Sequence, residues 1–219
     1  QLGRTVPLTS ERADYVPWQL ILEEFRQALD VGRLQHADWI TLLGSGEPTL
    51  HLQIGSILKA IRKLTTKPIA VITNGSLLHL AEVRRALAGA DAILPSLDAG
   101  TAALFRRLNR PHPTSTFERL IDGLVEFRRQ YDGRLWLEVM LVHHLNDGVA
   151  TLQSLARAIG RIQPDEVHLS LPLRPPAEPW VQPARAAALA RAVRILGSSA
   201  RILPPIPEGV KLSEGDDVV

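Results

Sequence analysis

The chain has 219 residues, 45% of them hydrophobic, and a formal net charge of +2, which fits one domain with a sizeable core better than two small ones. No apolar run approaches the roughly 18 residues of a membrane span, no basic start followed by an apolar run indicates a signal peptide, and no block of like charge indicates a nucleic-acid surface. The absence of cysteine excludes a disulfide framework and a thiolate metal site within these residues, and we expect a soluble, cytoplasmic protein with no membrane contact.

Along the chain, short apolar segments alternate with segments whose apolar residues recur at helical spacing. The first helix is predicted from Pro17, because proline is favoured at a helix start. Short, buried strands are predicted at residues 38–43, 68–73, 92–97, 135–142 and 166–171. Further helices are predicted at residues 50–64, 77–88, 101–108, 115–131, 151–162 and 184–196.

Strands separated by helices of this length imply right-handed βαβ units, and therefore an α/β fold with a parallel sheet. A barrel and a doubly wound sheet both satisfy the pattern. We assign residues 1–197 to this core. Residues 198–219 are proline-rich and then acidic, so we interpret them as a linker or covering arm rather than a further repeat.

In parallel α/β folds, functional residues gather at the carboxyl ends of the strands. The first predicted strand is followed by Gly44-Ser45-Gly46-Glu47, in which the glycines permit close backbone approach and Glu47 sits on a rigid turn. A carboxylate beside exposed backbone carbonyls suits an ammonium ligand, although an ordinary strand-to-helix turn can contain the same residues.

The following strand ends carry small polar residues, namely Asn74, Ser96 and Asp98, which suit ribose hydroxyls but are also common turn formers. Glu138 is a charge in an otherwise apolar strand, so we expect it to face a polar lumen. By period-two alternation, His168 and Ser170 share one face of the next strand.

Basic residues follow some of the strands as well. Arg174 leaves the last predicted strand beside two prolines, and it is our candidate contact for a ligand carboxylate or a substrate phosphate. Arg106 and Arg107 are interpreted as solvated helix surface. His143 and His144 follow a strand end, but no third ligand is spaced to complete a zinc site.

The order of these motifs resembles the radical S-adenosylmethionine (SAM) superfamily. The resemblance extends from Gln1 to about Leu196 and rests on Gly-Ser-Gly-Glu-Pro-Thr-Leu, Ile-Thr-Asn-Gly-Ser, Ser-Leu-Asp-Ala, Asn109-Arg110-Pro111 and Glu138-Val139-Met140-Leu141-Val142. Residues 1–5 and 15–17 look like the segment after the cluster loop in iron–sulfur oxidoreductases similar to wyosine-type tRNA-modifying enzymes. In that branch, Gln1 would directly follow the third cysteine of a Cys-x3-Cys-x2-Cys motif.

The resemblance implies a partial (β/α)6 TIM-like barrel whose first strand and cluster loop precede Gln1. It also implies site residues. Gly44, Ser45, Gly46 and Glu47 would hold the methionine ammonium of SAM, Asn74, Ser96 and Asp98 would lie near its ribose or methionine portion, and Glu138 and Ser170 would line the lumen.

The implied reaction is reductive cleavage of SAM by a [4Fe–4S] cluster, which gives a deoxyadenosyl radical that abstracts hydrogen from a substrate. Because the chain has no cysteine, we expect the cluster ligands just before Gln1, and these residues alone could bind SAM without cleaving it reductively. An electron donor such as flavodoxin or ferredoxin is also implied. The substrate stays open among an RNA base, a protein glycine and a small molecule.

Two other functions fit the same residues. The first is a cluster-free lyase or isomerase in which Glu138 or Asp98 is the general base and Arg174 binds a phosphate. The second is a non-catalytic barrel that binds SAM or serves as a scaffold.

Overall fold

The computed structural model describes residues 8–173, 176 and 178–203 of the chain. Its centre is a six-stranded sheet in the order β1-β2-β3-β4-β5-β6, and every neighbouring pair is parallel. The strands are β1 (Ile40–Leu42), β2 (Ile69–Thr73), β3 (Ala92–Pro95), β4 (Arg134–Met140), β5 (Glu166–Ser170) and β6 (Ala200–Ile202). Sequential order with parallel pairing is the topology of repeated βαβ units, as the alternating pattern predicted.

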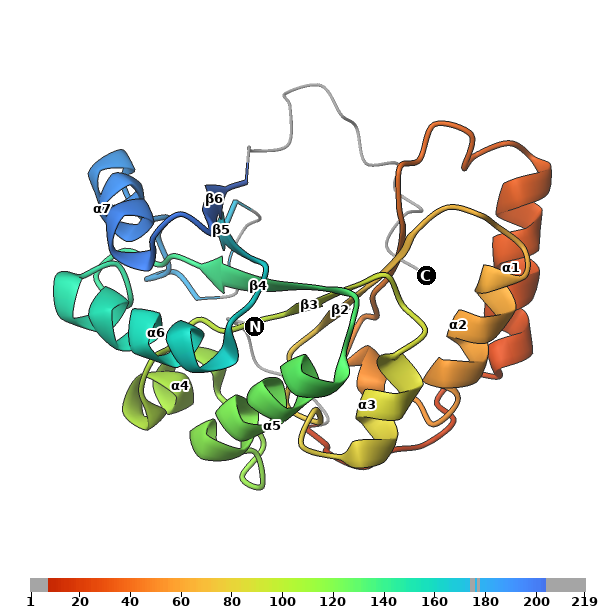
Figure 1. The fold of residues 1–219 in the computed structure, drawn as a ribbon, viewed down its shortest axis with the longest axis horizontal. Helices are drawn as coiled ribbons and strands as arrows, with labels where there is room; N and C mark the ends of the chain where they lie inside the picture. The colour runs from red at the N-terminus through yellow and green to blue at the C-terminus, as the bar shows by residue number, and fades with distance from the viewer. Residues whose placement is uncertain (1–7, 174–175, 177, 204–219) are drawn as a thin grey trace.

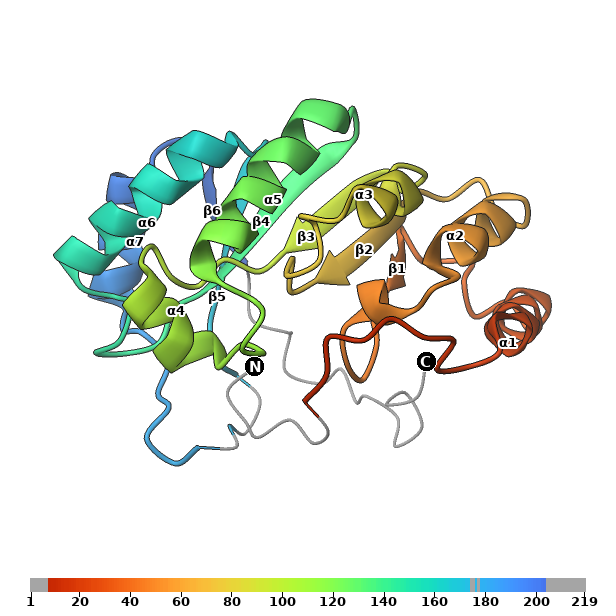
Figure 2. The same cartoon turned by 90° about the horizontal axis from the view of Figure 1, so that it is seen from below.

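The helices lie on one side of the sheet. They are α1 (Trp18–Asp30), α2 (Ile54–Arg62), α3 (Ala81–Leu87), α4 (Ala102–Asn109), α5 (Phe117–Gln130), α6 (Val149–Ile162) and α7 (Ala186–Leu196), with a short 3-10 helix η1 (Pro48–Leu50) after β1. Figure 1 shows the sheet as an arc with these helices on its outer side. Seen from below, α1, α2 and α3 lie side by side, and so do α5, α6 and α7 (Figure 2). The sheet is therefore an open partial barrel.

Strand β4 shows how the sheet separates its two faces. Leu135, Leu137 and Val139 are fully buried, whereas Trp136 and Glu138, which alternate with them, are half-buried. Successive side chains point to opposite faces, so the leucine and valine side chains pack under the helices and Glu138 lies on the concave face. The prediction that Glu138 faces the lumen thus agrees with the alternation in the structure.

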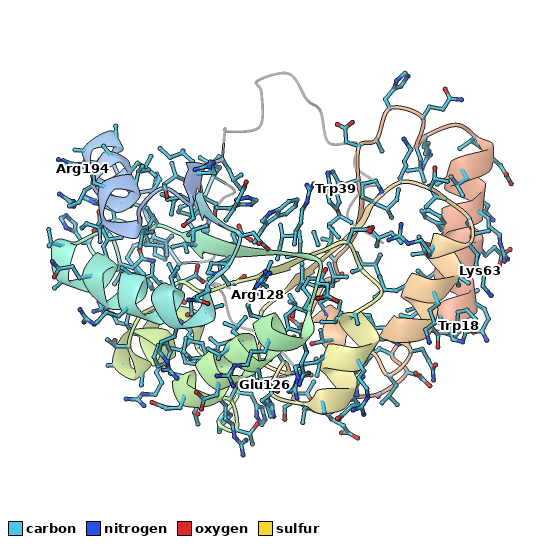
Figure 3. The ribbon with its side chains drawn as sticks, in the orientation of Figure 1. Trp18, Trp39, Lys63, Glu126, Arg128 and Arg194 are labelled. Carbon is cyan, nitrogen blue, oxygen red and sulfur yellow. The ribbon has the colours of Figure 1, made fainter. Side chains whose placement is uncertain are left out.

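An aromatic cluster occupies the concave face. The rings of Trp39 and Trp136 meet edge to face with centroids 5.3 Å apart, and the centroid of the His168 ring lies 5.4 Å from that of Trp136. The guanidinium of Arg134 lies 5.8 Å and 5.6 Å from the Trp39 and Trp136 rings. Figure 3 shows Trp39 on the open side of the sheet, opposite the helices. Ring and guanidinium contacts of this kind hold the amino-terminal part of the concave face together.

The interpretation of residues from 198 onward as a linker or arm was wrong for its first part. Ala200–Ile202 form β6, which pairs in parallel with β5 through Val167 and Ala200. Only Ala200 of this strand is buried, so three residues with one buried position gave no periodicity that could reveal it. Residues 204–219 lie outside the described part of the chain, as does the candidate anion contact Arg174.

Candidate active site

Hydrogen bonds join the carboxyl ends of neighbouring strands into one polar edge. Glu47, after β1, is bonded to Thr73 at the end of β2, and the backbone N–H of Ser96 donates to the carbonyl of Thr73 at 3.0 Å. Ser96 in turn forms a parallel bridge with Glu138 on β4, and Ser170 on β5 donates to Glu138. The predicted site residues on consecutive strand ends therefore lie next to one another.

Glu47 fastens the turn after β1 to the end of β2. Its Oε1 accepts hydrogen bonds from the backbone N–H of Thr49 at 3.0 Å, the hydroxyl of Thr49 at 2.5 Å and the hydroxyl of Thr73 at 2.5 Å. Among the described residues, its Oε2 accepts only the backbone N–H of Asn74, at 2.6 Å. Both threonines are buried, at 1% and 2% exposure, so the carboxylate is fixed in one orientation. Because each carboxylate oxygen has two lone pairs, Oε2 can accept one more donor.

The turn before Glu47 is exposed to solvent. Gly44, Ser45 and Gly46 are all exposed, and a Cβ added at Gly46 would meet no heavy atom within 4 Å. Packing against the part of the chain that the structure describes therefore does not explain the glycine at position 46. Its lack of a side chain leaves the backbone accessible at this edge.

Asn74 is exposed, and its Oδ1 accepts the backbone N–H of Ser76 at 2.9 Å, which forms the local turn expected of Asn. The turn leaves the Nδ2 group of Asn74 outside this bond. Glu138 is half-buried and accepts the hydroxyl of Ser170 at 3.0 Å. Beside it, His168 bonds to Glu166 at 2.9 Å.

Asp98 is enclosed by the chain. Its side chain is 2% exposed, its Oδ1 accepts the backbone N–H of Met140 at 2.8 Å, and its Oδ2 accepts the amide of Asn109 at 2.8 Å. Burial raises the pKa of Asp98 to about 6; the nearby charge of Glu138 adds to this, and the two hydrogen bonds oppose it. Asp98 thus belongs to the wall of the site, a position that disfavours its use as a general base for a ligand.

Sequence reasoning missed the two asparagines that hold this wall. Asn146, 1% exposed, donates to the carbonyls of Asp98 at 2.9 Å and Met140 at 2.8 Å and accepts the backbone N–H of Val142 at 2.7 Å. Asn109 belongs to a motif that carried the family resemblance, yet nothing in its local sequence indicated Asp98 as its partner. A buried aspartate implies that hydrogen-bond donors lie beside it, but only the fold identifies the residues that supply them.

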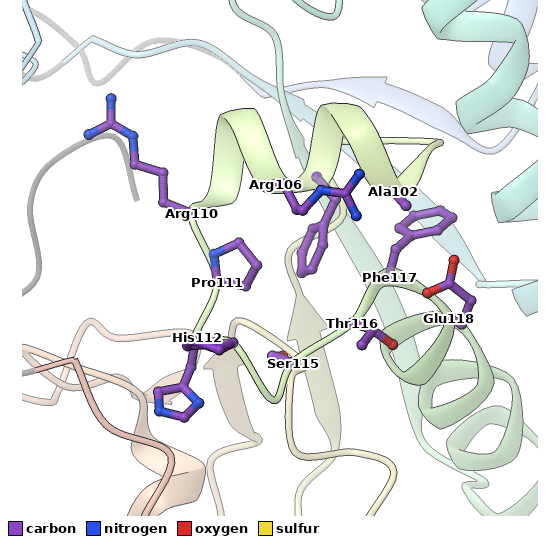
Figure 4. Close-up of a pocket in the computed structure, with 11 residues that line it drawn as sticks. Ala102, Arg106, Arg110, Pro111, His112, Ser115, Thr116, Phe117 and Glu118 are labelled. Atoms are coloured by element: carbon purple, nitrogen blue, oxygen red, sulfur yellow. The ribbon is translucent and has the colours of Figure 1, made fainter.

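A groove of about 440 Å³ lies between α4 and the start of α5 (Figure 4). Arg106 and Arg110 line it, and Arg110 pairs with Glu178 at 2.6 Å. A second hollow, of about 640 Å³, lies at the opposite, amino-terminal ends of the strands beside Trp39 and Arg134. Neither hollow is lined by the predicted SAM contacts, so the candidate site is defined by the bonded strand ends.

A curved parallel sheet with helices on one side and a polar edge at its carboxyl ends defines a partial-barrel α/β protein. Residues 6–155 match the radical SAM superfamily, and the chain belongs to this superfamily.

Solved structures show the same fold. A radical SAM methyltransferase from Sphaerobacter thermophilus matches with a TM-score of 0.61 and 24% identity, over 85% of this chain and 56% of that one. SuiB from Streptococcus suis, solved bound to S-adenosylmethionine, matches with a TM-score of 0.61 and 19% identity, over 85% of this chain and 40% of that one. At these identities the likeness concerns the fold alone, and it confirms the expected partial barrel.

Two curated relatives extend the similarity in sequence. A protein named GTPase Obg from Brachyspira hyodysenteriae is 37% identical over 77% of this chain, and a UPF0026 protein from Synechocystis sp. is 35% identical over 80%. The chain spans 25% of the first relative and 64% of the second. Activities of the longer proteins are therefore not transferred to this chain.

The residues present fit the two implied cofactors differently. The free lone pair of Glu47 and the accessible glycine turn suit the ammonium of SAM. The sequence has no cysteine, and the described residues contain no group of three His, Asp or Glu that could hold a metal ion, so they do not fit an iron–sulfur cluster. Within the described residues, no helix is long and apolar enough to cross a membrane.

Proposed function

We propose that this chain is the SAM-binding core of a radical SAM enzyme and that SAM binds along the carboxyl edge of β1 to β5. The observation that carries the proposal is the fixed carboxylate of Glu47, which has one unused lone pair beside an accessible glycine turn. An oriented carboxylate binds an ammonium group without first losing side-chain entropy, because its own chain already holds it in place.

The remaining polar groups extend the site across the sheet. Ser96 and Glu138 follow Glu47 in order across β3 and β4, and Ser170 continues this row on β5. Glu47 and Glu138 attract a ligand that carries both an ammonium and a sulfonium charge, while hydroxyl and amide groups such as Ser170 and Asn74 suit ribose hydroxyls.

SAM and a [4Fe–4S] cluster, when bound, would supply reductive cleavage and a deoxyadenosyl radical for hydrogen abstraction, which makes the proposed activity that of an oxidoreductase. The cluster ligands would come from residues outside this chain. The work of the chain itself is to bind SAM, orient it and exclude water. We propose that the substrate is an RNA base, a protein glycine or a small molecule, and that flavodoxin or ferredoxin donates the electron. The proposal also includes Arg174 as an anion contact and a cytoplasmic location.

The proposal is tested by calorimetric titration of the chain with SAM and S-adenosylhomocysteine. Glu47→Gln removes the charge and forces an amide NH₂ group either toward the donors of Thr49 and Thr73 or toward the N–H of Asn74. We expect binding to weaken by about 10-fold or more, since hydrogen bonds to charged groups contribute about 1.5–3 kcal/mol. Glu24→Gln, at an exposed position on α1, is the matched control and should bind like the wild type.

Two results would overturn the proposal. One is a wild-type chain that binds neither compound, and the other is a Glu47→Gln variant that binds as tightly as the control. The radical chemistry is tested on the full gene product by anaerobic iron–sulfur reconstitution. A product that contains no cysteine trio and binds no iron would refute that part alone. Activity retained in air, with iron chelated and no SAM added, would instead favour the cluster-free lyase or isomerase.

A further inference from the structure

The side chain of Asn109, at the end of α4, has a buried oxygen without a hydrogen-bond partner among the described residues. Its Nδ2 group donates to Oδ2 of Asp98 at 2.8 Å. A buried acceptor left unpaired costs about 1–3 kcal/mol, and native proteins contain few of them. Because Asn109 bonds to Asp98, which follows β3 at the polar edge, a ligand bound along that edge is a candidate for the missing donor.

Asp98 determines which end of the Asn109 amide is turned away from it. An ionised carboxylate can only accept hydrogen bonds, and Oδ1 of Asp98 already accepts the backbone N–H of Met140 at 2.8 Å. Oδ2 must therefore receive the Nδ2 group of Asn109, so that the carbonyl oxygen faces the other way. Asn146 fixes Asp98 in turn, because its amide donates to the Asp98 backbone carbonyl at 2.9 Å.

The backbone after Asn109 holds this arrangement from the other side. Arg110 adopts a left-handed conformation with φ of 45°, which ends α4 sharply after Asn109. The Arg110 guanidinium pairs with Glu178, in the loop after β5, at 2.6 Å. The Asn109-Arg110 pair thus connects the end of β3 with the loop that follows β5.

We propose that Asn109 is a SAM-contact residue whose carbonyl oxygen accepts a hydrogen bond from a hydroxyl or amino donor of the nucleoside, and that Asp98 is the positioning residue that presents this oxygen. The inference rests on the proposed function. Distance favours the nucleoside, rather than the ammonium, as the part of SAM that contacts Asn109. Glu47 follows β1 and Asp98 follows β3, and two strand spacings separate them by about 10 Å. A ligand whose ammonium lies at Glu47 therefore reaches Asn109 with its other end.

The test is calorimetric titration with S-adenosylhomocysteine and with methylthioadenosine, which lacks the amino-acid portion. Asn109→Leu removes the acceptor, and we expect about 3- to 10-fold weaker binding of both compounds, as for the loss of one neutral hydrogen bond. Asp98→Asn is nearly isosteric. Its new amide can donate to Oδ1 of Asn109, which turns the NH₂ group of Asn109 toward the ligand and should cause a similar loss. Arg107→Gln, exposed on α4, should bind like the wild type.

The outcomes separate this inference from the proposed function. Absence of binding to the wild type refutes both. If the wild type binds and neither Asn109→Leu nor Asp98→Asn weakens binding, only the role of Asn109 is refuted. The same holds if the variants weaken binding of S-adenosylhomocysteine but not of methylthioadenosine. Thermal melts report whether the variants fold. If they do not, the side-chain amide signals of Asn109 in the ¹⁵N-labelled wild type provide the test: they should shift when either compound is added, and unchanged signals would overturn the inference.

Discussion

The ionisation of Asp98 should make the stability of the fold depend on pH in a direction unusual for a carboxylate. Burial raises the pKa of Asp98 to about 6, from 3.8 for the free group. The folded state therefore binds this proton more tightly than the unfolded state does. The stability that the proton contributes is complete below the unfolded pKa and is lost as the pH rises through the folded one. A difference of about two units corresponds to about 3 kcal/mol.

Urea unfolding of the wild type and Asp98→Asn between about pH 4 and pH 8 measures this effect, because other titrating groups cancel in the comparison. We expect the wild type to lose about 3 kcal/mol relative to the variant across this interval and to level off near neutral pH. The cause is the burial of a charge that its two hydrogen bonds only partly compensate, and the asparagine avoids this cost.

Asp91 provides a control in which the pH dependence of stability has the opposite sign. Burial acts to raise its pKa, but hydrogen bonds from Arg62 and the backbone N–H of Ile69 outweigh burial and lower it. The stability that Asp91 contributes is present above its unfolded pKa of 3.8 and is lost as the pH falls below it, so a comparison with Asp91→Asn extended below about pH 4 should slope the other way, and between about pH 5 and pH 8 it should be flat. A wild-type advantage over Asp98→Asn that is constant, or that grows with pH, would refute the reasoning.

Three further variants test other parts of the structure. A Cβ at Gly100 would lie 2.3 Å from the backbone at Ser154, so Gly100→Ala should destabilise the fold by about 3 kcal/mol or prevent folding. A Cβ at Gly46 meets open space, so Gly46→Ala should leave the melting temperature within about 2 °C of the wild type. Trp136→Ala should lower the free energy of unfolding by about 2 kcal/mol in urea titrations, because it removes the centre of the aromatic cluster.

The sheet could be predicted from the sequence because its signals are local. Each of the first five strands is a short apolar run bounded by turn residues, and each lies between helices. The inward direction of Glu138 followed from its charge in an apolar strand. The edge strand at Ala200 could not be predicted, because three residues contain too little periodicity and their pairing with β5 is a tertiary effect.

The site could be predicted in outline but not in its bonding. Strand-end positions indicated that Glu47, Ser96 and Asp98 follow strands of the same sheet, at its carboxyl ends. Their partners lie far away in the sequence. The carboxylate of Glu47 bonds to Thr73, 26 residues on, and that of Asp98 to Met140, 42 residues on. No periodicity in the sequence encodes such pairs. Only the fold shows that the Glu47 carboxylate can accept a further donor, whereas the Asp98 carboxylate is enclosed.

The most direct test of the account is a crystal structure of the full gene product with its cluster reconstituted and S-adenosylmethionine bound. We predict that the methionine ammonium lies within hydrogen-bonding distance of Oε2 of Glu47 and the backbone of Gly44-Ser45-Gly46, with the nucleoside extending toward Asn109. A ligand bound in the groove beside α4, or at the amino-terminal ends of the strands near Trp39, would contradict the account.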